Sequence, residues 1–485
     1  MFFELNRYHL LVFVFWQLSN FLTGQFIVDI FSIPIYPLQY VNHNGLVFLE
    51  FCSPYELRIK KRFLNQVFEG PLEKFKMLEC YEDGADLELL KAILGRGAAV
   101  GALLFGFFSD KFGRKRVSIL ILILGIASLV ANALTEDSFM FFVYRFITGM
   151  AVGGVMVVNN VWVLESVLPK QRMVARGLCS NGWTIMGMTA LCYLTREWSK
   201  TYLVSAVCLV PALLLAIYLP ESCIWLHAKN KFERTIGAEK RVAQIAGIAH
   251  QPVERQPPST KTSLRCIVSN LESFKIVLTL VLLWCIASLS DNTYFVHHSE
   301  IKDQRLFHFY LMMGALIAVG EFALLLLQWN CNFVTRKWLY FGSSFSLALF
   351  VVSKMLLFII KISAGGTEVL YLGSNMFLGF VLDSLSLSTA EQIETNFRCT
   401  FFGFCVFLKH LVQVWVKEGN ARKTANSYMC IPIFSIILFA CGGLTWLYWK
   451  KDTRKINLDD VRLPEKKRDQ PEEVEMMATQ NRTNE

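Results

Sequence analysis

Five ionisable side chains interrupt otherwise apolar runs of the sequence, and their types could bind a charged ligand or carry a proton. They are Arg145, Glu321, Asp383, Lys409 and His410. An ionisable group inside a membrane span costs at least ~2.5 kcal/mol on insertion scales, so each one marks a candidate binding or transport site. A histidine can also exchange protons near neutral pH. The chemistry that these residues indicate is the recognition of an ion.

Motifs of enzymes are missing from the sequence. It contains no His and Cys cluster at metal-ligand spacing, no nucleophile elbow and no phosphate-binding loop. We therefore expect no enzyme activity, no metal and no cofactor. The formal net charge of +9 lies in short basic stretches beside apolar runs, which membrane topology explains better than nucleic-acid binding does.

Long apolar segments must position these ionisable residues. The chain of 485 residues is 54% hydrophobic, and runs such as 117–134 and 202–219 contain no Asp, Glu, Lys or Arg. A bilayer-spanning helix needs ~20 such residues, and the bilayer forces their backbone to form internal hydrogen bonds. The sequence therefore predicts an all-α membrane protein with twelve spans in two pseudo-symmetric six-helix bundles. The predicted spans are 10–33, 90–109, 116–134, 138–164, 174–195, 201–219, 275–296, 308–328, 338–361, 369–390, 398–416 and 428–449.

These spans divide the chain into six segments. Basic residues follow spans two, four and six, Arg176 among them, so both termini are predicted to be cytoplasmic. Cys52 and Cys80 share one polar loop and could form a disulfide or remain two free thiols. The segments are 1–33 with the N-terminus and first span, an exoplasmic loop at 34–89, the rest of the N-terminal bundle at 90–219, a cytoplasmic loop at 220–274, the C-terminal bundle at 275–449 and a disordered cytoplasmic tail at 450–485.

Polar patterns of the first half return in the second half. Glu165 and Arg172 are seven residues apart, as are Glu391 and Arg398, and the two pairs are offset by 226 residues. Segment 110–115 likewise returns as segment 332–337. Internal repeats of this kind are common in transporters.

Four motifs in the first half of the chain resemble those of a known family. The run Gly106-Phe-Phe-Ser-Asp-Lys-Phe-Gly-Arg-Lys115 resembles the signature loop of the major facilitator superfamily. Tyr144-Arg-Phe146, the Glu165 to Arg172 spacing and Pro220-Glu-Ser-Cys-Ile-Trp-Leu226 resemble its organic cation, organic anion and carnitine transporter branch, also called solute carrier family 22. The resemblance covers roughly residues 8–462 and is thinner in the second half, where Asn332 replaces the signature Asp.

The polar residues of these motifs form a predicted charge network at a cytoplasmic gate. Asp110 ends a span, where its carboxylate can meet the N-terminus of a neighbouring helix, and Arg114 can pair with Glu165 or Glu221. Such pairs would form only when the cytoplasmic ends of the bundles are closed, and the resemblance implies the same role. The alternative is that these charges only set the topology. The predicted network comprises Asp110, Gly113, Arg114, Arg145, Glu165, Arg172, Glu221, Glu391 and Arg398.

The resemblance also suggests a substrate site. His410 falls at a position that is generally acidic in cation carriers and basic in anion carriers of this branch. With Lys409 adjacent, an anionic or zwitterionic substrate is favoured, although Lys409 could instead snorkel to the interface or pair with Asp383. The predicted site contains His410, Lys409, Glu321, Asp383 and the aromatic Trp284.

We therefore predict a carrier of a small organic ion that works by alternating access in the plasma membrane. Its predicted partners are the substrate, the lipid bilayer and a coupling ion that is H⁺, Na⁺ or absent, with no nucleic acid. Two other functions stay open. A non-transporting receptor or scaffold of the same fold fits the divergent second half, and a sugar carrier of the same superfamily is disfavoured by segment 220–226 and by the basic residues of span eleven.

Overall fold

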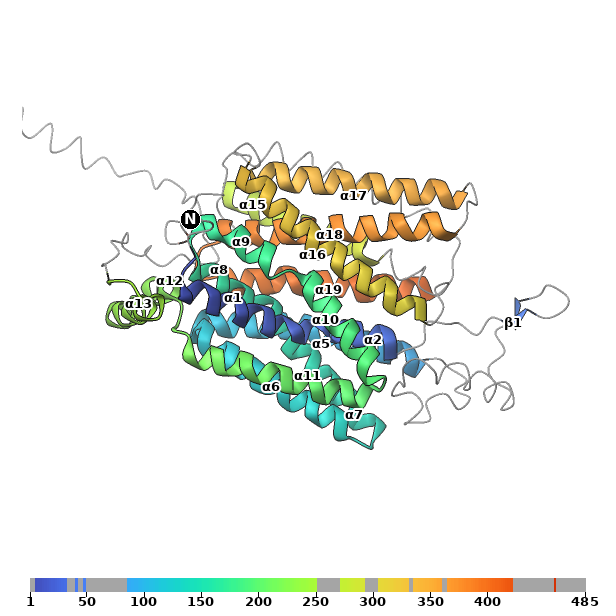
Figure 1. The fold of residues 1–485 in the computed structure, drawn as a ribbon, viewed down its shortest axis with the longest axis horizontal. Coiled ribbons are helices and arrows are strands. Elements are labelled where there is room, and N and C mark those ends of the chain that lie inside the picture. Colours follow the sequence, from blue (N-terminus) through green and yellow to red (C-terminus); the bar gives the residue numbers. More distant parts are fainter. Residues whose placement is uncertain are drawn as a thin grey trace, which may run out of the picture.

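The computed structural model describes a protein that is almost entirely helical, with long helices that run side by side along one axis (Figure 1). A short antiparallel ribbon that was not predicted, Tyr40–Val41 (β1) with Val47–Phe48 (β2), is the exception among the described residues. Cys52, Cys80, the predicted span 428–449 and nearly all of the predicted tail lie outside these residues. The described residues are 5–32, 40–41, 47–48, 85–250, 271–292, 304–330, 335–359, 364–421 and 458.

The first half of the chain supplies one group of packed helices, called here the first helix group. The predicted fourth span contains a π-helical turn, and the predicted fifth span is interrupted at Cys179 and Ser180. Ser180 starts the second piece of that span because its hydroxyl caps the helix by accepting a hydrogen bond from the Gly182 N–H at 2.9 Å. The group consists of α1 (Arg7–Asn20), η1 (Phe21–Gly24), α2 (Gln25–Ser32), α5 (Ala85–Phe112), α6 (Arg114–Leu134), α7 (Ser138–Gly154), η2 (Val155–Asn159), α8 (Asn160–Ser166), η3 (Pro169–Gln171), α9 (Arg172–Leu178), α10 (Asn181–Thr195) and α11 (Trp198–Tyr218).

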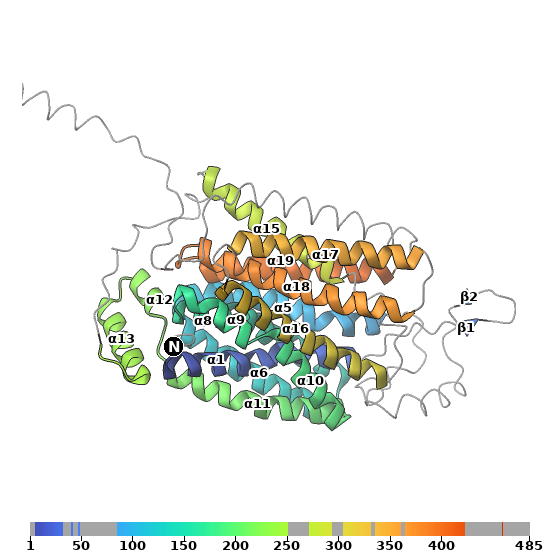
Figure 2. The same cartoon turned by 45° about the horizontal axis from the view of Figure 1, so that its top comes forward.

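The second half of the chain supplies the second helix group. Two shorter helices, α12 (Cys223–Ala228) and α13 (Phe232–Ala246), connect the groups along the chain and lie with the N-terminus at one end of the molecule (Figures 1 and 2). We call this the α12 end and the opposite one, where the ribbon lies, the β1 end. The second group consists of α15 (Leu271–Asn292), α16 (Gln304–Asn330), α17 (Arg336–Ile359), α18 (Ala364–Gln392) and α19 (Arg398–Ala421).

Several helices carry an apolar surface of the kind that faces lipid. Leu134, Leu194 and Val207 are each more than 65% exposed, which water would disfavour in side chains of this size. Six helical segments among the described residues are long and apolar enough to cross a bilayer, and Phe274–Ser288 is a shorter apolar helix. The six are Arg7–Phe31, Ala92–Phe112, Arg114–Leu134, Ser138–Ser166, Trp198–Tyr218 and Leu306–Asn330.

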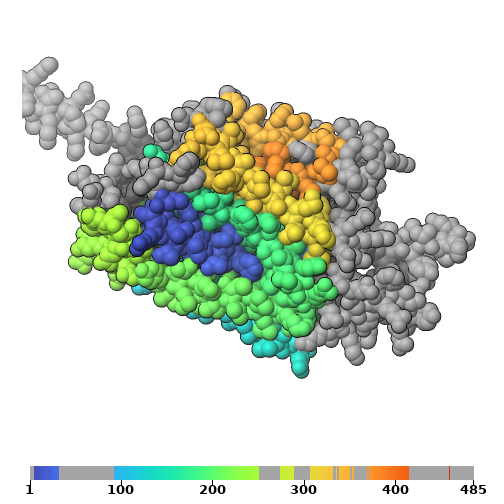
Figure 3. All heavy atoms as spheres, in the orientation of Figure 1, coloured from blue at the N-terminus to red at the C-terminus, as the bar shows by residue number. Residues whose placement is uncertain are grey.

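The two helix groups meet along two seams. In one seam α5 packs against α19, and in the other α9 and α10 pack against α16, where green and yellow surfaces adjoin in Figure 3. Backbones approach closely in the first seam, because a Cβ atom on Gly403 would lie 2.3 Å from the Ala102 carbonyl oxygen. Small residues permit this approach between membrane helices, where backbone contact and dispersion replace hydrophobic burial as the source of association.

Replacing Gly403 with leucine should separate α5 from α19. Overpacking of this kind costs about 1–3 kcal/mol, equal to roughly a 5- to 150-fold change in the ratio of closed to open molecules. Cys399 is fully buried beside Gly106 in this seam. Its reaction with maleimide should accelerate by a similar factor in a protein whose other cysteines are replaced by serine. Gly237→Leu is the matched control, since a Cβ there meets nothing within 4 Å, and equal reactivity in both variants would contradict the packing argument.

Candidate functional site

Asp110, near the end of α5, accepts hydrogen bonds from the first turn of α19. Its Oδ2 accepts from the Thr400 N–H and hydroxyl, each at 2.7 Å, and its Oδ1 accepts from the Cys399 N–H at 3.3 Å. These N–H groups are donors that a helix N-terminus leaves without intrahelical partners, and the helix dipole favours an anion there. The predicted contact of Asp110 with a helix N-terminus is therefore present, and it joins the two helix groups.

Arg114 is fully buried and links Asp110 to Glu165. Its Nη1 lies 3.0 Å from Asp110 Oδ1, and its Nε and Nη2 each donate to a Glu165 oxygen at 3.2 Å. Nη2 also donates to the Thr395 carbonyl of the second helix group at 2.9 Å. Of the two acids predicted to pair with Arg114, Glu165 therefore binds its guanidinium group.

Two further ion pairs connect the groups at the α12 end, and they exchange partners between the sequence repeats. Arg398 Nη1 lies 2.7 Å from Glu165 Oε1, and Arg172 Nη1 lies 3.1 Å from Glu391 Oε1. The acid of each repeat thus pairs with the arginine of the other repeat. All four side chains are buried, so separation of the groups at this end would break both pairs. Arg398 also donates to the carbonyl of Leu458 at 3.3 Å.

Glu221 binds backbone rather than the Arg114 side chain. Its Oε1 accepts hydrogen bonds from the N–H groups of Arg114 at 2.9 Å, Lys115 at 3.0 Å and Ser222 at 3.1 Å. Burial raises the pKa of Glu221, and the backbone donors offset part of that rise. Gly113 makes this contact sterically feasible, because its φ of +111° favours glycine and a Cβ there would lie 2.4 Å from Glu221 Oε2.

Arg145 does not belong to this network. It precedes Glu165 by about 20 residues on one helical run, a separation of roughly 30 Å at the helical rise. Its guanidinium forms an ion pair with Asp29 of α2 and donates to the Tyr202 hydroxyl at 2.6 Å. Both partners are in the first helix group, so this pair stabilises one group and does not connect the two. The structure therefore corrects the predicted network by removing Arg145.

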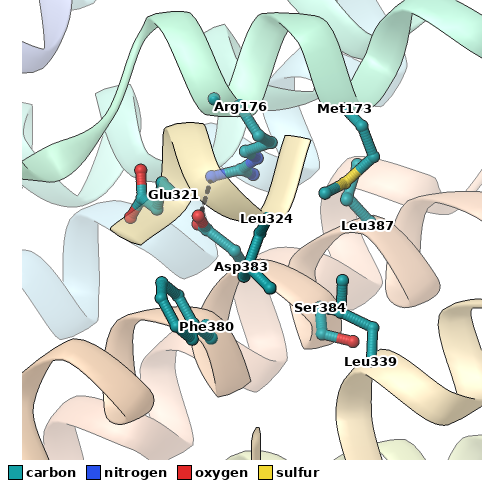
Figure 4. A pocket seen from close by; sticks show the side chains of 10 residues that line it. Met173, Arg176, Glu321, Leu324, Leu339, Phe380, Asp383, Ser384 and Leu387 are labelled. Carbon is teal, nitrogen blue, oxygen red and sulfur yellow. Dashed lines mark hydrogen bonds and ion pairs between the residues drawn. The ribbon is translucent and has the colours of Figure 1, made fainter. Parts of the chain in front are cut away.

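A second buried cluster of charges lies where α9, α16 and α18 meet, and Figure 4 shows Arg176, Glu321 and Asp383 converging there. Arg176 Nη1 lies 2.8 Å from Asp383 Oδ1, and Nη2 donates to Asn160 at 2.7 Å and to Ser386 at 2.6 Å. The three charged residues line a cavity of about 10 Å³, which is room for roughly one water molecule. This conformation is therefore nearly closed around them.

The role of Arg176 differs from its predicted one, because in the sequence it stands among the basic residues that set topology. In the structure α9 packs against α16 of the second helix group, and Arg172 and Arg176 are 1% and 9% exposed. Their i, i+4 spacing places them on one helix face, and Arg176 also lies inside the predicted span 174–195. These two signals could have identified it. The alternative in which Lys409 pairs with Asp383 is wrong, since the ion pair that Asp383 forms is with Arg176.

Among the five residues predicted for the substrate site, Glu321 and Asp383 share this cavity, while the other three lie elsewhere. The His410 ring stacks on Phe26 of α2 with 5.7 Å between the ring centroids, so it forms a different contact between the helix groups. The Trp284 indole donates to Thr389 at 3.1 Å. Lys409 accepts a hydrogen bond at its backbone carbonyl from Ser288 at 2.6 Å.

An aromatic contact joins the helix groups at the β1 end. Phe31 of α2 stacks on Phe307 of α16 with 4.3 Å between centroids and 6° between ring planes. Tyr310 meets Phe31 edge-on at 5.6 Å, and Tyr193 of α10 meets Phe307 edge-on at 5.6 Å. The groups are therefore in contact at both ends in this conformation, with the charged cavity between the two contacts.

Comparison with known proteins identifies the family. Residues 78–415 match the sequence profile described as Major Facilitator Superfamily. The chain belongs to this superfamily. Its relatives include an uncharacterized protein of Caenorhabditis elegans, 25% identical over 94% of each chain. They also include Solute carrier family 22 member 7 of Homo sapiens, 33% identical over 32% of this chain and 28% of that protein, and its counterpart in Bos taurus, 30% identical over 35% and 31%.

Solved structures of this superfamily share the fold. The proton:xylose symporter XylE bound to 6-bromo-6-deoxy-D-glucose aligns with a TM-score of 0.65 and 16% identity, over 93% of this chain and 98% of that one. A double Trp variant of XylE aligns with a TM-score of 0.67. The predicted all-α major facilitator fold is thus confirmed. The chain is thus an integral multi-pass membrane protein of a transporter superfamily, and over about a third of its length it is similar to solute carrier family 22 proteins.

Charge exchange between Arg172 and Glu391 should test the pairing across this major facilitator interface. Arg172→Glu places two acids together in a buried site, and breaking a buried ion pair costs about 3–5 kcal/mol. The unfolding temperature of the purified protein should fall clearly in Arg172→Glu and in Glu391→Arg, and it should recover in large part in the double variant. Additive losses in the double variant would mean that the two side chains do not stabilise the interface as a pair.

Proposed function

We propose that this transporter carries a small organic ion with an anionic group, a zwitterion or an anion, by alternating access. The observation that carries the proposal is the state of Arg176. Its Nη atoms bind Asp383, Asn160 and Ser386, but its Nε is buried and has no hydrogen-bond partner among the described residues. A buried guanidinium N–H without an acceptor is unfavourable, and a carboxylate or sulfonate of a substrate would satisfy it.

The position of Arg176 supports this role. It lies on the first helix group and its ion-pair partner Asp383 on the second, so a ligand bound between them contacts both moving parts. Trp16 adds an aromatic face, with the guanidinium 4.7 Å from its ring centroid. We keep His410 as a second candidate for charge selection, because its stacking on Phe26 also spans the two groups.

Alternating access requires that each end open in turn. Opening at the α12 end would break the Glu165–Arg398 and Arg172–Glu391 pairs, and opening at the β1 end would separate Phe31 from Phe307. We propose that the α12 end faces the cytoplasm of a cell whose plasma membrane contains the protein, since basic side chains such as Lys111 and Arg116 gather there.

Two other functions remain as outcomes of the test. A receptor or scaffold would keep the closed interface without moving solute, and a sugar carrier would transport an uncharged substrate. Arg176 disfavours the sugar carrier. A bound sugar offers only uncharged hydroxyl groups, which cannot replace the Asp383 carboxylate as the counter-charge of the Arg176 guanidinium.

Uptake of three probes of fixed charge should separate these functions. The probes are labelled benzenesulfonate as an anion, glycine betaine as a zwitterion and tetraethylammonium as a cation, with xylose as the sugar. We expect saturable uptake of benzenesulfonate or glycine betaine. Arg176→Gln should lower it by roughly 10- to 150-fold, since a hydrogen bond to a charged group contributes about 1.5–3 kcal/mol. Asp110→Ala should also lower it, by weakening closure at the α12 end.

The control is Lys200→Gln, which removes a lysine that is 66% exposed and paired with Glu197 at the surface, and which should leave uptake unchanged at equal expression. Uptake of tetraethylammonium that is insensitive to Arg176→Gln would indicate a cation carrier, and saturable xylose uptake a sugar carrier. Proper surface expression with no uptake of any probe would support the receptor or scaffold.

A further inference from the structure

Glu321 is a buried carboxyl group that the proposed substrate contact leaves unused. Its side chain is 4% exposed, and its Oε2 has no hydrogen-bond partner among the described residues. The group lines the charged cavity together with Asp383 of α18, and Figure 4 shows both side chains there. An ionised carboxylate is strongly disfavoured in a buried position that offers too few donors.

The charges that face Glu321 do not balance if every group is ionised. Arg176 on α9 is the cation of the cavity, and its Nη donors go to Asp383, Asn160 and Ser386 rather than to Glu321. Asp383 on α18 is a second carboxyl group. A third helix, α10, also packs against α16. It contains no Asp, Glu, Lys, Arg or His, and its titratable residues are Cys192 and Tyr193. One cation thus faces two carboxyl groups, and one bound proton would make the cluster neutral.

We infer that Glu321 and Asp383 share one proton and that this proton moves together with the anionic group of the substrate. This inference rests on the proposed function. Two carboxyl groups side by side do not readily ionise together, so a pair of this kind retains a proton in a range where an isolated carboxyl would lose it.

Binding of substrate would strengthen the retention of the proton. An anion that takes Arg176 as its counter-ion weakens the Arg176–Asp383 pair, which leaves Asp383 beside Glu321 without its cation. The carboxyl pair then binds the shared proton more tightly. Because coupling between two ligands is reciprocal, the proton must in turn raise the affinity for the anion. One proton would accompany each substrate molecule, and a monovalent anion would cross without net charge movement.

The other buried ion pair of the membrane region does not compete for this role in the described structure. Arg145 and Asp29 are one cation and one anion, with Tyr202 as a further hydrogen-bond partner, so their charges already balance. They also lie within the first helix group. Glu321 and Asp383 instead lie at the interface that opens and closes.

Infrared spectroscopy of the purified full-length protein in lipid tests the shared proton without any substrate. We expect the carbonyl stretch of a protonated carboxyl group at neutral pH, lost in Glu321→Gln and retained in Glu233→Gln, which changes an exposed acid of α13. Gln mimics the shape of a protonated Glu, so folding should be preserved. If Glu321→Gln nevertheless fails to fold, Glu321→Asp should shift the band instead of removing it. A wild-type spectrum without such a band, or a band that Glu321 variants leave unchanged, would overturn the inference.

Transport in proteoliposomes tests the coupling. An inward proton gradient should raise the initial uptake of benzenesulfonate or glycine betaine several-fold in the wild type, and an internal pH dye should report acidification that accompanies the probe. Glu321→Gln should still transport but lose the response to the gradient. Uptake that responds to a sodium gradient and not to a proton gradient would overturn the coupling. Absence of uptake for every probe would overturn the proposed function and the coupling together, whereas the infrared band would still decide whether the proton is shared.

Discussion

The closed interface at the α12 end depends on arginines that are buried between the helix groups and therefore need acids from both. Arg114 binds Asp110 and Glu165 of its own group, and Arg398 reaches the same Glu165 from the other group. The attraction within such a cluster has to exceed the loss of hydration of every charge, which requires the bidentate and shared geometry seen here. Asp110 at the N-terminus of α19 supplies one further contact that exists only when the groups touch.

The exchange of partners between repeats explains why one motif occurs twice. In each repeat the Glu lies near the end of one helix, α8 or α18, and the Arg at the start of the next, α9 or α19, and neither Glu pairs with the Arg of its own repeat. Each needs a partner from outside its repeat, and the pseudo-symmetric copy offers one at the matching height. The duplicated spacing is thus a consequence of pairing between the halves.

Much of this arrangement could be predicted from particular residues. Asp110 at the end of a span and the duplicated Glu–Arg spacing predicted the ion-pair cluster at the α12 end. Acidic residues near span ends contribute little to topology, so their presence there indicates another role. Tertiary contacts were less predictable. Nothing in the sequence near Arg145 indicates that Asp29 of another helix neutralises it, and the position of Arg176 among other basic residues predicts a topology charge although it pairs with Asp383. Likewise, the aromatic contact of Phe31 with Phe307 joins two of the chain's 40 phenylalanines, and composition does not distinguish them from those that face lipid.

The two ends of the interface are built from different chemistry, ionic at the α12 end and aromatic at the β1 end. Exposure of apolar rings to water raises the heat capacity, whereas exposure of polar groups lowers it. The two opening reactions should therefore have heat-capacity changes of opposite sign. As a consequence, the free-energy difference between opening at the α12 end and opening at the β1 end will depend on temperature along a curve rather than a straight line. Temperature alone will then shift the side to which an unloaded carrier opens, with no ligand or gradient.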